Sequence, residues 1–282
     1  MNAVAAPNLN IDLHTHTTAS DGALSPRALI DLAAKNNTDL LAITDHDTVA
    51  GYDTARDYAK TRGIKLITGV EVSTTWQSRG IHIVGLNFVV SHAAITSLLQ
   101  HQAAARQRRA QIIVQKLNKA GLSLTLAEVQ ASANSLHIGR PHIARALVEK
   151  GEVASVNKAF KKYLGSGKIG DVKSGWVSLS EAVAAINASG GVAVVAHPNH
   201  YQMTRTKLLR LLDEFIEAGG QGIEVISGKQ HRDITQKYAQ IATDKGLYAS
   251  MGSDFHGHFA YAASIGQLAS LPDNITPIWT VF

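Results

Sequence analysis

Histidine and acidic side chains recur along this 282-residue chain in short motifs that could bind metal ions. Six of the 13 histidines belong to such motifs, close to a carboxylate or at the end of an apolar run. In chain order the candidate ligands are His14, His16, Asp21, His46, Glu71, His82, His197, Asp254 and His256. Neutral imidazoles and carboxylates are the ligands that a cluster of divalent cations binds. The pattern therefore indicates a metal-dependent hydrolase.

Two of these motifs place alternate residues of an extended segment on one face. His14 and His16 lie in the alternating apolar and polar segment 11–16, which is typical of a strand. Residues i and i+2 of a strand point the same way, so both imidazoles can reach one cation. Asp254 and His256 repeat this spacing after a predicted strand. A His-x-His pair alone is a weak signal, because paired structural histidines are commoner than metal ligands.

The other candidates gain their meaning from where they lie relative to predicted strands. Glu71 lies inside the apolar segment 67–72, where a buried carboxylate needs a partner such as a metal ion. His46 and His197 each follow an apolar strand. Taken singly, Asp21 could be a turn residue, and His82 and His197 could be core histidines. Taken together they indicate an active site, because barrel enzymes build theirs at the carboxyl ends of strands.

Strand-like and helix-like segments alternate over most of the chain, which predicts an α/β fold. Predicted strands cover residues 11–16, 39–44, 65–73, 81–88, 192–196, 222–226 and 248–251. Predicted helices between them cover residues 26–37, 52–61, 207–218 and 233–245. This alternation implies a parallel sheet covered by helices. The number of strands favours a closed or nearly closed barrel over an open sheet.

The middle of the chain has helical patterns only. Predicted helices cover residues 93–120, 126–133, 141–149 and 156–164. We expect residues 92–170 to form a small all-helical inserted domain that caps the site. Residues 1–91 and 171–282 would then be the two parts of the barrel.

Composition sets broad limits on the class of protein. A hydrophobic content of 45% is ample for a sizeable core, and cysteine is absent, which suits a reducing cytoplasm. No apolar stretch approaches the roughly 20 residues of a membrane span. The formal net charge of +5 is compatible with a polyanionic substrate. We expect a cytoplasmic protein, with no membrane association and no obligatory protein partner evident.

The same motifs carry a resemblance to a known family. The strings DLHTHTTASDG, AITDHDT, GVEVST, IHIVGLN, AHP and GSDFH resemble those of the polymerase-and-histidinol-phosphatase (PHP) superfamily of metal-dependent phosphoesterases. The similarity reaches the helical segment through GRPHIAR and AFKKYL. Within the superfamily the chain most resembles bacterial enzymes described as 3′,5′-nucleoside bisphosphate phosphatases and as 5′→3′ exoribonucleases.

The resemblance implies a distorted (β/α)7 TIM-like barrel holding two to three divalent ions. By analogy one ion would be bound by His14, His16, Glu71 and Asp254. A second would be bound by Asp21, His46 and His256, and Glu71 would bridge to a third completed by His82 and His197. Manganese is the expected ion, and zinc or iron would also fit these ligands. A metal-bound water activated by Asp21, His46, Glu71 and Asp254 would attack phosphorus.

The expected activity is removal of the 3′-phosphate from 3′,5′-bisphosphate nucleotides, with 5′→3′ release of mononucleotides from short RNA. Nucleotide or short RNA is the expected substrate. One alternative is a histidinol-phosphate-type phosphomonoesterase. Another, from a different class, is a non-catalytic metal-stabilised binding domain.

Substrate contacts are expected from the helical segment and from the loop after AHP. Arg140 and His142 lie at the start of a predicted helix, whose first-turn N–H groups favour anions. A solvated arginine is the alternative for Arg140, and the resemblance favours a phosphate contact for both residues. The family pattern Gly-Arg-Tyr after AHP is replaced by Asn199-His200-Tyr201, so His200 would stand where an arginine contacts substrate. Three further arginines are expected to be a solvated helix face rather than an RNA track: Arg106, Arg108 and Arg109.

Overall fold

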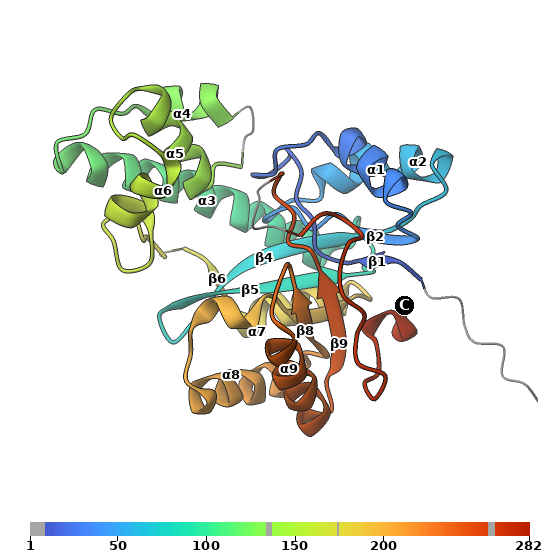
Figure 1. The fold of residues 1–282 in the computed structure, drawn as a ribbon. Coiled ribbons are helices and arrows are strands. Elements are labelled where there is room, and N and C mark those ends of the chain that lie inside the picture. Colours follow the sequence, from blue (N-terminus) through green and yellow to red (C-terminus); the bar gives the residue numbers. More distant parts are fainter. Residues whose placement is uncertain (1–8, 134–136, 174, 259–262) are drawn as a thin grey trace, which may run out of the picture.

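The strands form two sheets that lie next to each other (Figure 1). The computed structural model describes residues 9–133, 137–173, 175–258 and 263–282. The smaller sheet is parallel and has the order β1 (Ile11–Asp12), β2 (Leu40–Ala42), β3 (Lys65–Ile67). The larger sheet has the order β6 (Val177–Ser178), β4 (Gly69–Trp76), β5 (Arg79–Leu86), β7 (Val192–Val195), β8 (Gly222–Ser227), β9 (Tyr248–Gly252). The prediction of a mixed α/β fold is confirmed.

One strand corrects the prediction of a parallel sheet. β5 runs antiparallel to both of its neighbours, β4 and β7. Gln77 and Ser78 join β4 to β5, and their φ angles of 45° and 63° fit a two-residue hairpin turn. The predicted strand 65–73 is also divided, because β3 and β4 belong to different sheets. Periodicity reports which residues are extended, but it does not report strand direction.

Hydrogen bonds connect the two sheets beside the functional motifs. Isolated parallel bridges pair Thr15 with Phe255 and His46 with Glu71. The Leu13 N–H also donates to the Met251 carbonyl over 3.0 Å. These links place the segment after β1 beside the segment after β9. They also place the segment after β2 beside the first residues of β4.

Within the described part of the chain, five helices cover the sheets, and four of them were predicted. They are α1 (Pro26–Lys35), α2 (Ala50–Thr61), α7 (Leu179–Ala188), α8 (Arg205–Glu217) and α9 (Arg232–Lys245). Ser25 caps α1 as predicted, because its hydroxyl accepts the Ala28 N–H. Sequence reasoning missed α7, although Ser178 and Glu181 form a capping box at its start. Short 3-10 turns lie at Pro198–Tyr201 (η2) and Ile278–Val281 (η3).

The helices of the middle segment pack on one another and form their own hydrophobic cluster. They are α3 (Ala93–Lys119), α4 (Leu126–Ala133), α5 (Arg140–Glu149) and α6 (Val156–Ala159), which continues as the π-helical turn η1 (Phe160–Leu164). The long helix α3 contacts α7 beside the larger sheet and α4 and α5 within the cluster (Figure 1). Among the described residues, no helix has the length and apolar character to cross a membrane.

Candidate metal centre

The predicted ligands converge from segments far apart in the chain. His14 and His16 follow β1, and Asp254 and His256 follow β9, which lies next to β1. Glu71 and His82 lie on the paired strands β4 and β5. The structure brings all nine predicted ligands into four groups, of which three share members, and together they contain His14, His16, Asp21, His46, Glu71, His82, His197, Asp254, His256 and also His200.

The first group is built on the two imidazoles of the His-x-His motif. The Nε2 atoms of His14 and His16 lie 3.1 Å apart. Both lie 3.3–3.4 Å from Glu71 Oε2 and 3.4–3.5 Å from Asp254 Oδ1. Two ligands placed about 2.1 Å from one ion at the tetrahedral angle would be separated by about 3.4 Å. The two imidazoles are therefore spaced from each other and from each carboxylate oxygen as they would be around one cation.

The second group surrounds Asp21. Its Oδ1 lies 3.3 Å from His256 Nε2, and its Oδ2 lies 3.7 Å from His46 Nε2. His16 Nδ1 lies 3.9 Å from Asp21 Oδ1, so this imidazole faces both groups.

Glu71 connects these groups to a third. Its Oε1 lies 2.7 Å from His82 Nδ1 and 2.8 Å from His197 Nε2, while its Oε2 lies 2.9 Å from His46 Nδ1. Because its two oxygens face different histidines, Glu71 can bridge two ions. His200 joins His197 and Asp254 in a further group, and its ring stacks on His197 at 5.0 Å.

Unsatisfied buried atoms support a metal site. His16 Nδ1, Asp21 Oδ1 and Glu71 Oε2 are buried and have no hydrogen-bond partner. Buried polar atoms normally have a hydrogen-bond partner, so these three unpaired nitrogen and oxygen atoms are suited to coordinate a cation. The residues present fit divalent ions, since imidazole and carboxylate suit manganese, zinc and iron alike.

The pKa shifts of Glu71 and His16 also support a metal site. Burial acts to raise the pKa of Glu71, but the imidazoles of His46, His82 and His14 outweigh it and hold the pKa well below its usual range. Burial, helped by the nearby His256, lowers the pKa of His16 to about 3. Glu71 is thus held as a carboxylate and His16 as a neutral imidazole, which are the forms that bind metals. At His256 burial lowers the pKa, but the carboxylate of Asp21 outweighs it and raises the pKa to about 10.

A second buried glutamate, Glu224 on β8, holds two of the ligands and was missed by sequence reasoning. Its Oε1 lies 2.5 Å from His14 Nδ1, and its Oε2 accepts the backbone N–H of His197 over 2.6 Å. A carboxylate on the far nitrogen fixes the tautomer and orientation of a metal-binding histidine. The signal was available, because Glu224 lies in the apolar segment Gly222–Ser227, just as Glu71 lies in its own strand.

Backbone strain gathers at the same place. Asp47, His197 and Asp254 have φ angles of 54°, 28° and 52°, a region that non-glycine residues rarely adopt. Gly252 lies so close to β1 that a Cβ atom on it would be 2.2 Å from the His14 Cβ. Only glycine permits this approach of β9 to the ligand segment.

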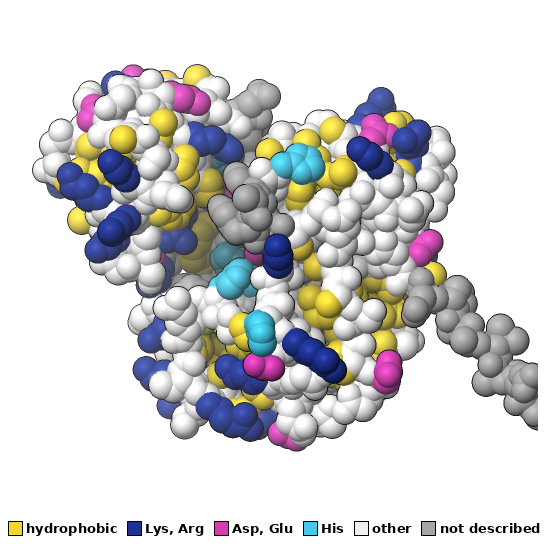
Figure 2. All heavy atoms as spheres, viewed as in Figure 1, with side chains coloured by type: hydrophobic (Ala, Val, Ile, Leu, Met, Phe, Trp, Pro, Cys, Tyr) yellow, Lys and Arg dark blue, Asp and Glu magenta, His cyan; other side chains and the backbone are white. Residues whose placement is uncertain are grey.

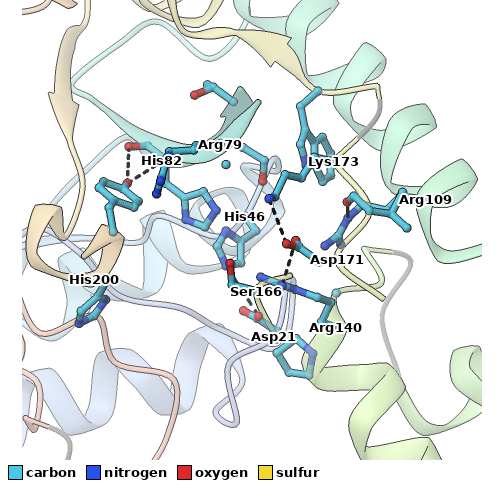
Figure 3. Close-up of a pocket in the computed structure, with 18 of the residues that line it drawn as sticks. Asp21, His46, Arg79, His82, Arg109, Arg140, Ser166, Asp171, Lys173 and His200 are labelled. Carbon is cyan, nitrogen blue, oxygen red and sulfur yellow. Dashed lines mark hydrogen bonds and ion pairs between the residues drawn. The ribbon is translucent and has the colours of Figure 1, made fainter. Parts of the chain in front are cut away.

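A cavity of about 650 Å³ opens over the ligands. Four ligands line it, namely Asp21, His46, His82 and His256. Five cationic side chains also line it, namely Arg79, Arg106, Arg109, Arg140 and Lys173. Figure 3 labels all of them except Arg106. Sequence reasoning did not single out Arg79 or Lys173. The space-filling view shows a hollow between the helical cluster and the rest of the molecule, with histidine at its edge (Figure 2).

The three predicted substrate contacts lie in different settings. Arg140 and His200 line the cavity. Arg140 Nη1 donates to the Leu164 carbonyl over 3.0 Å and lies 3.6 Å from Asp171 Oδ1. His142 is 1% exposed, and its Nδ1 accepts the Gly139 N–H at the start of α5. It is absent from the residues that line the cavity.

The prediction that the arginines of α3 are a solvated face is wrong for two of them. Arg106 and Arg109 are 5% and 7% exposed, whereas Arg108 is exposed. Arg106 Nη2 lies 2.6 Å from the buried Asp47 Oδ2, and Arg109 Nε donates to the Val172 carbonyl over 2.6 Å. Both guanidinium groups lie over the Trp176 ring. Their partners are distant in sequence, so helical periodicity alone could not show the burial.

The fold and the motifs that carry the predicted ligands can be compared with those of known proteins. Residues 12–271 match the model of the PHP domain family. The chain belongs to this family, as the motif resemblance indicated.

The relatives extend over nearly the whole chain. It is 44% identical over 271 residues to a 5′-3′ exoribonuclease of Haemophilus influenzae, covering 96% of this chain and 98% of the relative. It is 43% identical over 271 residues to a 3′,5′-nucleoside bisphosphate phosphatase of Chromobacterium violaceum, covering 96% and 95%. A solved structure from C. violaceum, described as an amidohydrolase with bound sulfate, has a TM-score of 0.89 and 42% identity and covers 96% of this chain and 95% of its own.

Proposed function

We propose that this chain is a metal-dependent phosphoesterase that removes the 3′-phosphate from 3′,5′-bisphosphate nucleotides and releases 5′-mononucleotides 5′→3′ from short RNA. The observation that carries the proposal is the make-up of the cavity, which has metal ligands and several cationic side chains in one space. A substrate with two phosphates uses both features, since one phosphate can meet the metal ligands and the other the cationic groups. The activities for which the two relatives are named support this choice.

We propose that two to three divalent ions, most favourably Mn²⁺, are held by the nine ligands in the three groups described above. Bound cations would supply Lewis acidity and lower the pKa of water at the site. The chain's own residues hold the geometry. Asp21, His46, Glu71 and Asp254 place their donor atoms around the reaction centre, and Glu224 keeps His14 in the required tautomer.

The second phosphate would contact the cationic side of the cavity. Arg140 is already held by Leu164 and Asp171, so its remaining N–H groups are oriented before substrate arrives. His200 lies beside the ligands and would contact substrate from the opposite side of the cavity. His142 caps α5 and would act by holding the turn that carries Arg140.

We also infer that the strands form the distorted (β/α)7 barrel, capped by the helical domain of residues 92–170. Support comes from the bridges that join the smaller sheet to β4 and to the segment after β9. Further support comes from the separate hydrophobic cluster of the middle helices.

The test compares adenosine 3′,5′-bisphosphate with adenosine 5′-monophosphate as substrates for the purified protein with Mn²⁺. The bisphosphate should be hydrolysed far faster, because only it can occupy both parts of the cavity. Equal turnover of the two nucleotides would overturn the two-phosphate requirement. Asp21→Asn should abolish hydrolysis while circular dichroism stays unchanged, and Asp53→Asn on the exposed surface of α2 should keep full activity.

A histidinol-phosphate-type phosphomonoesterase is the alternative enzyme. It would need one phosphate and an amine, whereas the cavity offers several cations beyond the ligands. Faster hydrolysis of an amino-alcohol phosphate than of the bisphosphate nucleotide would favour it.

A further inference from the structure

A second cavity, of about 580 Å³, lies on the helical segment outside the metal centre. We call it the lysine cavity, and it is lined by Glu152, Val153, Ala154, Lys158, Lys161, Lys162, Tyr163 and Lys168. All four lysines are exposed. None of the metal ligands belongs to this set, so the catalytic reaction does not account for the gathering of charge.

The charge in the lysine cavity is not neutralised by the protein. Among the described residues, no carboxylate lies within ion-pair distance of any of the four lysines. By contrast, Lys150 on the same segment lies 2.7 Å from Glu128. The single acidic residue of the lining, Glu152, accepts the Ser123 N–H over 3.0 Å. The lysines are therefore free to bind phosphate groups.

An aromatic ring lies among these charges. The Lys162 Nζ lies 4.9 Å from the centre of the Tyr163 ring. Tyr163 is half-buried and packs against the hydrophobic cluster of the helical segment, which fixes the ring. Positive charge beside a fixed aromatic face is the composition by which proteins bind single-stranded nucleic acid, since phosphates meet the charge and bases stack on the ring.

The lysine cavity and the catalytic cavity are lined by neighbouring residues of segment 160–168. Phe160, Ser166 and Gly167 line the catalytic cavity, and Ser166 is seen there in Figure 3. Their neighbours Lys161 and Lys168 line the lysine cavity. A strand that leaves the metal centre across Ser166 and Gly167 would therefore reach the lysines.

We propose that the lysine cavity binds single-stranded RNA downstream of the nucleotide whose 5′-end lies at the metal centre. The inference rests on the proposed function and deepens it. It makes the chain a binder of oligomers, because contacts to the downstream phosphates add to those of the first nucleotide. A bisphosphate mononucleotide is too short to use the lysine cavity.

The test compares two variants with equal charge loss on the same helical segment. Lys161→Gln/Lys162→Gln removes charge from the lysine cavity. Lys116→Gln/Lys119→Gln removes two exposed charges at the end of α3, outside the lining of the catalytic and lysine cavities. Binding of a 5′-phosphorylated RNA of about ten nucleotides, within the usual site size, is measured by fluorescence anisotropy at several salt concentrations. The Mn²⁺-loaded protein is used, and the first linkage carries a phosphorothioate to slow cleavage.

The slope of log Kd against log salt should fall by about 1.4 in the first variant, at about 0.7 for each lost phosphate contact, and stay unchanged in the second. Hydrolysis of adenosine 3′,5′-bisphosphate should be the same in both. Equal slopes for the two variants would overturn the proposal, and so would equal losses on oligomer and mononucleotide. If the wild-type protein hydrolysed neither substrate, the proposed function would fail, while the slopes would still decide whether the lysine cavity binds RNA.

Discussion

Glu71 is the residue at which three groups of ligands meet. Its Oε2 faces His14, His16 and His46, and its Oε1 faces His82 and His197. The carboxylate is 1% exposed, so the cost of burying its charge must be offset by these neighbours or by cations. Sequence reasoning found Glu71 because a carboxylate within an apolar strand is unusual.

The substitution Glu224→Gln should weaken metal binding about 10- to 100-fold. The amide retains the shape of the side chain, but it no longer offers His14 Nδ1 a charged acceptor. Calorimetric titration with Mn²⁺ measures the change. Glu217→Gln, at an exposed position on α8, is the matched control and should bind as the wild type does. Unchanged affinity in Glu224→Gln would show that this contact does not position the ligand.

Among the elements, α3 is the one that connects the helical segment to the metal centre. Gln102 and Arg106 on α3 both donate to the carboxylate of Asp47, which adjoins the ligand His46. Asp47 also accepts the Ser73 N–H over 2.7 Å, so its carboxylate is fully paired although it is buried. The position of α3 and the position of His46 are therefore held by one buried network.

Arg106→Met should destabilise the protein by about 3–5 kcal/mol at neutral pH, because it leaves a buried carboxylate without its cation. Burial acts to raise the pKa of Asp47, but Arg106 outweighs it and the pKa lies below the ordinary 3.8. A depressed folded-state pKa gives stability that is present above pH 3.8 and lost as the pH falls through the folded pKa. The difference in free energy of unfolding between variant and wild type, measured with urea, should therefore be largest near neutral pH and smaller in acid. A difference that does not change with pH would contradict the pairing of Arg106 with the Asp47 carboxylate.

The approach of β9 to β1 gives a second prediction for the elements. Gly252→Ala should destabilise the protein by about 1–3 kcal/mol or more and weaken Mn²⁺ binding, since its Cβ would collide with His14. Gly80→Ala is the control, because a Cβ on Gly80 meets no atom within 4 Å. Equal unfolding midpoints for the two variants would show that β1 can move aside without cost.

The elements also show what could be predicted and why the rest could not. Amphipathic periodicity located α3, α8 and α9, because burial of one helix face produces a repeating pattern of apolar residues in the sequence. The direction of β5 produces no such pattern. The burial of Arg106 depends on Asp47, which is 59 residues away in the chain. Contacts of that kind follow from the tertiary fold and cannot be read from local pattern.

For the candidate site, the nine ligands could be predicted because suitable residue types coincided with predicted strands and their ends. The nearness of the two cavities could not be predicted, since it depends on how η1 follows α6. The contact between the His142 ring and the Gly139 N–H at the start of α5 could likewise not be read from the sequence, and the substrate contact of His142 stays a prediction.

At the scale of the whole molecule, metal binding should be coupled to stability. Ions that bind only the folded state stabilise it by about 2.7 kcal/mol at 100 times their Kd. Excess Mn²⁺ should therefore raise the Tm by several degrees, and EDTA should reverse the rise. His16→Gln, which removes a ligand shared by two groups, should show a much smaller shift. A Tm that does not respond to either reagent would contradict a metal site in the folded protein.

The central claim is that β4, β5 and the segments after β1, β2, β7 and β9 bring their side chains together around cations. Anomalous scattering from crystals grown with Mn²⁺ tests it most directly, because it locates each ion. We predict a peak within bonding distance of His14, His16, Glu71 and Asp254, and at least one more beside Asp21 and His46. Crystals with Mn²⁺ in excess and no peak among these side chains would contradict the account.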